Sequence, residues 1–375
     1  MSDSPGVRWW AETAWWDTPE YAAHVAPCAK EFHLAVDAMA RHFDRTWWRK
    51  VIERREANRV AANLIGHGTL TLRFLLGVGT DIRLLDGAAG FESKMAELKK
   101  DKNGATLLEC EIAGLYADAG LRVSFPTAGQ DHRTPDLIVD CSDHRTAVEC
   151  KKLEREEWEH WADGLMLAVV QMMPSDAAAS VAVEIQINDR LSEIRTKEDE
   201  CPGLNHAIAQ EIIACIRDAI SAALASSRPL PVEFDLPGLG HGWLRAKEGD
   251  AHSSVSGFAI SPVSQLRRLI TNGLYRASDQ LPANLPGIVV VQSEYLPDPD
   301  FARLVFDAAT KSDPDRFTRV AAWLILPVRY LGDNRSPVLL VNQHSPQSRW
   351  PRSAMRPEYD PGLRPPGGTG PPGWI

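Results

Sequence analysis

The stretch from residue 103 to residue 152 constrains the fold most, because its pattern predicts one helix followed by three strands. Leu108, Ile112 and Leu115 share one helical face, and Gly120 stands where a helix often ends. Three short apolar segments follow, and a turn-rich CSDHR joins the last two: LRVSF, PDLIVD and TAVECK. This order predicts an α/β fold in which the last two strands form a hairpin.

The predicted hairpin brings charged side chains together at one end. Alternate residues of a strand point to the same face, so Glu149 and Lys151 share a face, while Val148 and Cys150 point to the opposite one. We expect the apolar face to pack on a helix. Antiparallel pairing would bring Asp136, at the start of the first strand, within a few ångströms of Glu149.

Two neighbouring carboxylates point to a cation. They repel each other and raise each other's pKa unless positive charge compensates. Lys151 supplies one charge, and a divalent ion would supply the rest. Oxygen ligands favour Mg²⁺ or Mn²⁺ over zinc, and such a site can hydrolyse a phosphodiester with the lysine orienting the water. The alternative is a surface hairpin whose acids pair with Lys151, Lys152 and Arg133.

The motif at this hairpin resembles that of the PD-(D/E)xK nuclease superfamily, which includes restriction endonucleases and Holliday-junction resolvases. Pro135 and Asp136 match the PD, and Glu149, Cys150 and Lys151 match the ExK. Other Pro-Asp and Glu-x-Lys words occur, but this pair alone has the required order at the edges of two apolar strands. The resemblance implies a restriction-endonuclease-like mixed sheet flanked by helices. It also implies a metal held by Asp136, Glu149 and the backbone carbonyl of Cys150.

The same resemblance implies a further acid on the preceding helix, in a pattern of the type G-x4-E-x-E. Gly104, Glu109 and Glu111 match it, with Glu109 the better candidate and Glu111 the second. In the implied site, Asp136 and Glu149 bind the metal, while Glu109 holds a second metal or a water. Lys151 steers the nucleophile. These roles make up the implied catalytic set: Glu109, Asp136, Glu149 and Lys151.

The chain of 375 residues is long for one compact domain, and its composition shifts along its length. After residue 345 the sequence holds eight prolines and five glycines, which predicts a disordered tail. The segment before the motif is rich in tryptophan, and a separate α/β pattern follows the motif. We therefore predict five parts: a helical region at 1–88, a first part of the nuclease core at 89–155, an α/β insertion at 156–260, a second part of the core at 261–344 and the tail at 345–375.

The net charge of −9 argues against a protein that coats nucleic acid with its whole surface. A local basic segment at 41–59 has seven Arg or Lys residues, and its alternative reading is a solvated helix whose tryptophans pack inward. Further candidates for substrate contacts, each with a solvated surface residue as the alternative reading, are His132, His144, Arg267, Arg268, Arg276 and, from the family resemblance, Gln280.

Several function classes are disfavoured by the sequence. The apolar runs are too short to cross a bilayer, and residues 1–10 lack the pattern of a secretory signal. Six cysteines without a CxxC pair are typical of reduced thiols in a cytoplasmic protein. We predict a Mg²⁺- or Mn²⁺-dependent endonuclease that acts on DNA in preference to RNA, in a setting such as bacterial defence or repair. A homodimer or a protein partner would suit double-strand cleavage. The alternative is an inactive nuclease-fold scaffold that binds nucleic acid or protein.

Overall fold

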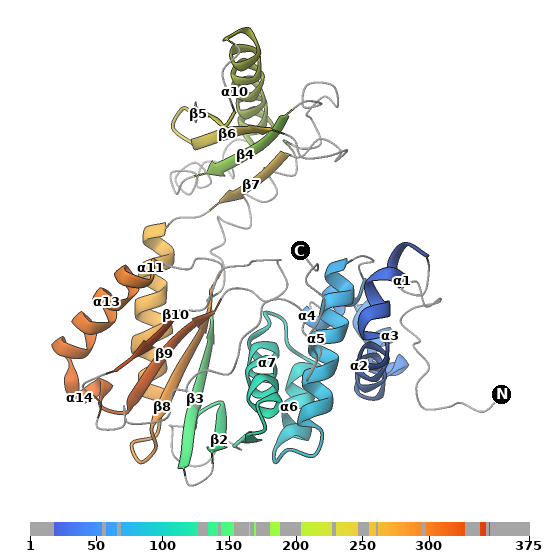
Figure 1. Cartoon of the computed structure of the whole chain (residues 1–375), viewed down its shortest axis with the longest axis vertical. Helices are drawn as coiled ribbons and strands as arrows, with labels where there is room; N and C mark the ends of the chain where they lie inside the picture. Colours follow the sequence, from blue (N-terminus) through green and yellow to red (C-terminus); the bar gives the residue numbers. More distant parts are fainter. Residues whose placement is uncertain are drawn as a thin grey trace. The chain divides into compact units, whose positions relative to one another are not determined.

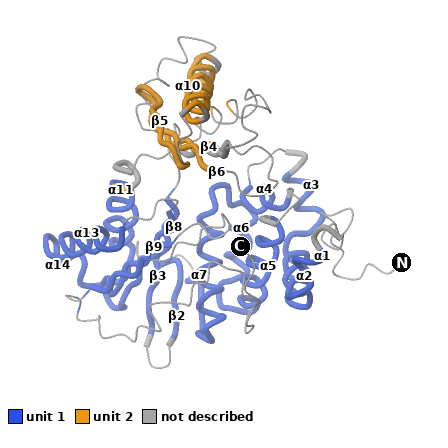
Figure 2. The backbone as a smooth tube through the Cα atoms, turned by 45° about the horizontal axis from the view of Figure 1, so that its top comes forward, with its two compact units in different colours: residues 1–153, 267–375 blue, residues 154–266 orange. Residues whose placement is uncertain are grey.

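The chain folds into two compact units, coloured separately in Figure 2. One unit comprises residues 1–153 and 267–375, and the other comprises residues 154–266. The predicted insertion at 156–260 falls within the second unit, whereas the predicted N-terminal region belongs to the same unit as the motif. The computed structural model describes residues 19–54, 58–65, 69–126, 134–141, 144–153, 165, 169, 181–187, 204–226, 230–246, 255–259, 262–293, 298–326, 338–342 and 345.

A six-stranded mixed sheet organises the first unit, in the order β1-β2-β3-β8-β9-β10. β3, β8 and β9 run parallel, and the remaining neighbours pair antiparallel. The predicted α/β class, with a mixed sheet flanked by helices, is confirmed. The strands are β1 (Arg122–Ser124), β2 (Leu137–Cys141), β3 (His144–Lys152), β8 (Gly287–Gln292), β9 (Val320–Leu326) and β10 (Val338–Val341).

Helices lie on both faces of this sheet (Figure 1). Val148 and Cys150 of β3 join Ile288 and Leu324 in the core that the N-terminal helices cover, so the expectation of an apolar face packed on a helix is confirmed. On the other face, Phe306 packs against Trp323 of β9 with ring centroids 5.8 Å apart. The helices of this second face are α11 (Pro262–Ile270), the π-helix η3 (Thr271–Arg276), α12 (Ala277–Gln280), α13 (Pro299–Ser312) and α14 (Pro314–Phe317).

The N-terminal helices pack closely on one another and on the sheet. A Cβ on Gly79 of α5 would lie 2.3 Å from the carbonyl oxygen of Ala35 in α2, so only glycine permits this approach. Trp47 and Trp48 pack against the core, as expected for inward-facing tryptophans, and Trp47 Nε1 donates to the Lys99 carbonyl. The helices are α1 (Pro19–Val25), η2 (Ala26–Cys28), α2 (Ala29–His42), α3 (Arg45–Arg54), α4 (Arg59–Ile65), α5 (Thr69–Leu85), α6 (Phe91–Leu98) and α7 (Ala105–Asp118).

The start of α7 is fixed against the end of β3. Asp101 accepts hydrogen bonds from the backbone N–H groups of Gly104 (2.7 Å) and Leu107 (2.9 Å). Lys152 Nζ donates to the Asn103 carbonyl at 2.7 Å. Gly104 adopts φ = 85°, and a Cβ there would lie 2.4 Å from Lys152 Nζ. The positive φ therefore favours glycine, and a larger residue would also have to displace the Lys152 ammonium from its contact with Asn103.

The second unit pairs a four-stranded sheet with one long helix, α10 (Leu204–Ser226). Ile212 and Ile216 of α10 pack with Ile185 and Leu244 of the sheet. Among the helices that the structure describes, α10 included, none combines the length and the apolar character needed to cross a membrane. The strands are β5 (Val232–Leu236), β6 (Gly240–Ala246), β4 (Val181–Ile187) and β7 (Val255–Ala259), in sheet order.

Candidate active site at the β2–β3 hairpin

The register of the hairpin brings Asp136 beside Glu149. Leu137 pairs with Val148, so the next position of each strand places Asp136 opposite Glu149. The backbone N–H of Cys150 donates to Asp136 Oδ2 at 2.8 Å, which fixes the carboxylate against β3. The Cys150 thiol itself is buried in the core, as an apolar side chain would be.

Glu149 and Lys151 form an ion pair on the same face of β3. Lys151 Nζ lies 2.5 Å from Glu149 Oε1, and the Glu149 side chain is fully buried. Glu149 Oε2 is buried too, and no donor among the described residues reaches it. A buried carboxylate oxygen without a donor is costly, so this atom has an unmet demand for positive charge or a proton.

Glu109 of α7 is bound by a lysine that the sequence analysis did not single out. Lys94 of α6 places Nζ 2.6 Å from Glu109 Oε2 and 2.7 Å from Glu97 Oε2. The Lys94 and Glu109 side chains are only 14% and 12% exposed. The sequence shows Lys94 and Glu97 at helical spacing, but the contact with Glu109 depends on how α6 packs on α7.

Burial raises the pKa of all three acids, and the charge of Asp136 adds to the rise at Glu149 and at Glu109. Burial raises the pKa of Glu149 to about 8, with a further contribution from the charge of Asp136, although Lys151 acts in the opposite direction. Burial and the charge of Asp136 likewise raise the pKa of Glu109 to about 7, against the effect of Lys94. Burial also raises the pKa of Asp136. The Cys150 N–H, the charges of Lys151 and Lys94, and the Glu149 side chain offset part of this rise.

The two lysines remain cationic. Burial alone would lower their pKa, but Glu149 outweighs it at Lys151 and Glu109 outweighs it at Lys94, so both values are raised. Three carboxylates therefore face two ammonium groups in a largely buried cluster. With every group ionised, the cluster is one positive charge short.

The carboxylate oxygens of the cluster are ligands that suit a hard divalent cation, but they are not already arranged around one metal position. Within the described ranges, no group of three or more His, Cys, Asp or Glu residues is arranged to hold a metal ion. Glu109 and Glu149 each contact a lysine instead. Asp136 and Glu149 nevertheless offer adjacent carboxylate oxygens, with Glu149 Oε2 free of any described donor. These two are the residues that could hold Mg²⁺ or Mn²⁺.

The second acidic candidate on α7 points elsewhere. Glu111 is buried, and its Oε2 lies 3.5 Å from Gln292 Nε2 at the end of β8. The charge of Glu109, in contrast, contributes to the raised pKa of Glu149. The structure thus brings Glu109 together with Asp136 and Glu149, and it places Glu111 against Gln292.

The remaining candidates lie on the surface or outside the described residues. Arg267, Arg276 and Gln280 are exposed, and Arg268 is half-buried. Of the basic partners in the surface-hairpin alternative, Lys152 donates to Asn103, and Lys151 pairs with Glu149 in a buried position. Four predicted features lie outside the described residues, namely His132, Arg133, the side chain of His144 and the tail beyond residue 345.

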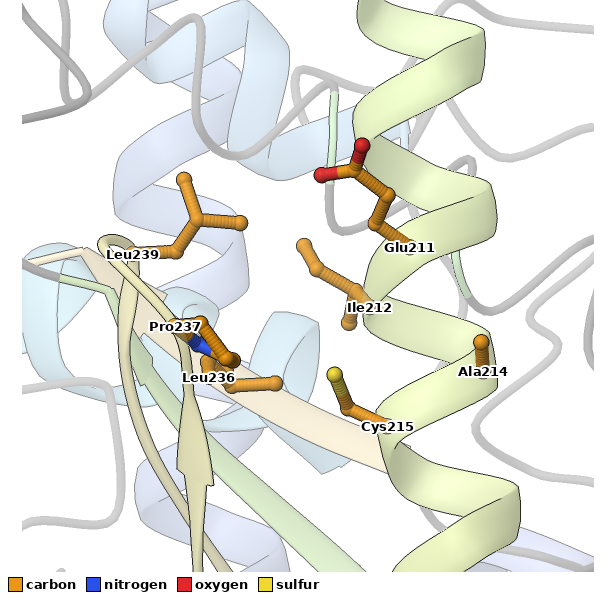
Figure 3. A pocket seen from close by; sticks show the side chains of 7 residues that line it. All are labelled: Glu211, Ile212, Ala214, Cys215, Leu236, Pro237 and Leu239. Carbon is orange, nitrogen blue, oxygen red and sulfur yellow. The ribbon is translucent and has the colours of Figure 1, made fainter.

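A pocket of about 320 Å³ lies within the second unit and carries none of this chemistry. It opens between α10 and the β5–β6 turn, and its lining is mostly apolar (Figure 3). Burial raises the pKa of Cys215 in its wall, with Asp218 and Glu211 acting in the same direction, so the thiol stays protonated. The acid cluster of the first unit is the stronger candidate for catalysis.

Comparisons with protein-family models, with curated proteins and with solved structures find no match to this chain.

Proposed function

We propose that this protein is a divalent-metal-dependent nuclease that hydrolyses phosphodiester bonds, with DNA as the preferred substrate. The observation that carries the proposal is the buried pair of Asp136 and Glu149, in which Glu149 Oε2 meets no described donor while Lys151 contacts Oε1. Buried acids with raised pKa values beside a lysine are candidates for a functional site.

Each residue of the cluster has a role that follows from its contacts. A bound Mg²⁺ or Mn²⁺ would stabilise charge on the phosphate and acidify a water molecule. Asp136 and Glu149 would hold the ion, with the backbone carbonyl of Cys150 as the further ligand that the family resemblance implies. The Cys150 N–H orients Asp136, so the backbone of β3 sets the position of that carboxylate.

Lys151 would orient the attacking water or stabilise negative charge as it develops on the phosphate. Its ammonium is held 2.5 Å from Glu149 and is 26% exposed, so it can reach both the buried acid and a substrate. Glu109 would hold a second ion or a water on the α7 side of the cluster.

One observation favours a second candidate function, that of an inactive scaffold with a nuclease-like fold. Lysines already compensate Glu109 and Glu149, and no three-ligand metal group is preformed among the described residues. In that case the cluster would be a structural ion-pair network, and nucleic acid or protein would be bound without cleavage.

A cleavage assay separates the two candidates. Supercoiled plasmid, linear duplex, single-stranded DNA and RNA are incubated with the full chain and Mg²⁺ or Mn²⁺. Asp136→Asn and Lys151→Ala test the cluster, and Asp140→Asn, at the other end of β2 and paired with exposed arginines, is the matched control. The nuclease proposal predicts cleavage by the wild type and the control alone. Equal cleavage by Asp136→Asn would contradict it, and wild-type protein that binds DNA without cutting would favour the scaffold.

A further inference from the structure

Lys94 is held at Glu109 by several contacts that the catalytic roles above do not use. Its ammonium contacts Glu109 at 2.6 Å and Glu97 at 2.7 Å, and it lies 6.0 Å from the centroid of the Phe125 ring. Only 14% of its side chain is exposed. Lys94 therefore has one well-defined position, unlike a surface lysine that samples many rotamers.

The Lys94 ammonium, held at the buried Glu109 carboxylate, occupies the position that a metal ion would take there. A divalent ion at Glu109 would have to displace Lys94 or share the acid with it. Displacement would leave the buried ammonium without its main partner, and sharing would bring like charges together where water screens them poorly. Either route makes Glu109 a poor ligand for a second ion while Lys94 is present.

The other side of the cluster differs in this respect. Lys151 occupies only Oε1 of Glu149, and the adjacent Oε2 meets no donor among the described residues. Asp136 lies opposite Glu149 and is fixed by a backbone N–H instead of a cation. On this side, the carboxylate oxygens that no described lysine contacts thus lie at Asp136 and at Glu149 Oε2.

We propose that Lys94 stands in for a second metal at Glu109, so that the cluster takes one divalent ion, held by Asp136 and Glu149. Glu109 is then a positioning residue that can orient a water molecule. This inference rests on the proposed nuclease function and chooses between the two roles left open for Glu109.

Titration calorimetry with Mn²⁺ on the full chain tests the inference without relying on cleavage. The wild type should bind one ion at the cluster. Lys94→Met removes the charge while keeping a long side chain, and it should bind two. Lys94→Arg keeps the charge and should bind one, as should Lys311→Met, a control at an exposed lysine on α13. The Mn²⁺ dependence of cleavage should become cooperative in Lys94→Met alone.

The possible outcomes separate this inference from the proposed function. Two ions in the wild type, or one ion in a folded Lys94→Met, would overturn the role of Lys94 and leave the nuclease proposal in place. No Mn²⁺ binding and no cleavage by the wild type would overturn the nuclease proposal itself. If Lys94→Met does not fold, the wild-type stoichiometry decides, because one ion supports the inference and two ions contradict it.

Discussion

The β2–β3 hairpin carries a carboxylate near each end of β2, and the two ends differ in burial and in their supply of positive charge. At one end, Asp140 contacts Arg145 Nε at 2.8 Å and Arg122 Nε at 3.0 Å; the Asp140 side chain is 16% exposed, and these arginines are 64% and 82% exposed. Burial opposes ionisation of Asp140, but Arg145 and Arg122 together outweigh it and lower its pKa. At the other end, burial prevails and the pKa values of Asp136 and Glu149 are raised.

Acids paired with basic residues thus have different effects on stability at the exposed end and at the buried end of the hairpin. At the exposed end one acid has two cations, water screens the pairs, and little stability depends on them. At the buried end three acids share two cations, and the deficit costs stability in the metal-free protein. An arrangement that costs stability is a candidate for function.

The largest expected difference between the two ends is in how far removal of an acid lowers the cleavage rate. Glu149→Gln should reduce the cleavage rate at least about a hundredfold, because it removes an anionic ligand and leaves Lys151 without its partner. Asp140→Asn should stay within about twofold of the wild type, since it alters only exposed pairs. Single-turnover cleavage of the preferred substrate with excess Mn²⁺ measures both. Similar losses in the two variants would remove the functional distinction between the ends of the hairpin.

The next difference between the two ends is in how far the free energy of unfolding falls when a basic side chain is removed from each end. Lys151→Met should lower the free energy of unfolding by about 1–3 kcal/mol in metal-free buffer near pH 8.5, because Glu149 is left buried and more weakly compensated. The cost should shrink near pH 6, where Glu149 can take up a proton. Arg145→Met at the exposed end should cost less than about 1 kcal/mol at either pH. Urea unfolding provides the measurement, and equal costs would show that burial does not distinguish the ends.

The pH dependence of stability should come from the buried end. The pKa values of Glu149 and Glu109 are raised to about 8 and about 7, so the folded state binds more protons than the unfolded state in this range. The stabilising protonation is complete below the unfolded pKa values and is lost as the pH rises through the folded ones. Metal-free protein should therefore lose about 4 kcal/mol between about pH 6 and pH 9.

Glu149→Gln should flatten this slope, and Asp140→Asn should leave it unchanged. The pKa of Asp140 is lowered, so its contribution to stability is present above its ordinary pKa and is lost only in acid. Thermal melts across the pH series test this prediction. Stability that rises between about pH 6 and pH 9 in the wild type would contradict the raised pKa values.

The smallest expected effect is that of salt at the exposed end. Asp140→Asn should lower the free energy of unfolding by less than about 1 kcal/mol at low ionic strength, and the difference should fade as salt screens the exposed arginines. Urea unfolding at low and high salt measures it. A large effect that resists salt would mean that this end is less solvated than the exposure of Arg122 and Arg145 indicates.

The hairpin and its register were predictable because strands have a strict alternation. In β2 the buried Leu137 and Val139 alternate with the half-buried Ile138 and Asp140, so a shift by one position would move Asp140 to the core face. The strand at Gly287–Gln292 was predictable for a different reason, since GIVVV is a short, β-branched apolar run, which is typical of a strand buried on both faces. Local patterning therefore predicted the strands that carry Asp136, Glu149 and Lys151.

The partners of the acids depend on tertiary packing and were not predictable in the same way. A helical wheel could not choose between Glu109 and Glu111, because that choice follows from how Lys152 and Asp101 fix α7 along β3. Lys94 reaches Glu109 only because α6 packs beside α7. The helical region at 1–88 likewise joins the unit that holds the motif through side-chain packing that no local pattern encodes.

Metal-dependent melting tests most directly whether the buried end of the hairpin is a cation site. The wild type and Asp140→Asn should both gain roughly 5 °C or more in the melting temperature of the first unit when Mn²⁺ is present at about 100 times its Kd. Asp136→Asn should show no such gain, because it removes one of the two proposed ligands. A wild-type melting temperature that does not respond to Mn²⁺ or Mg²⁺, or an equal gain in Asp136→Asn, would contradict the account.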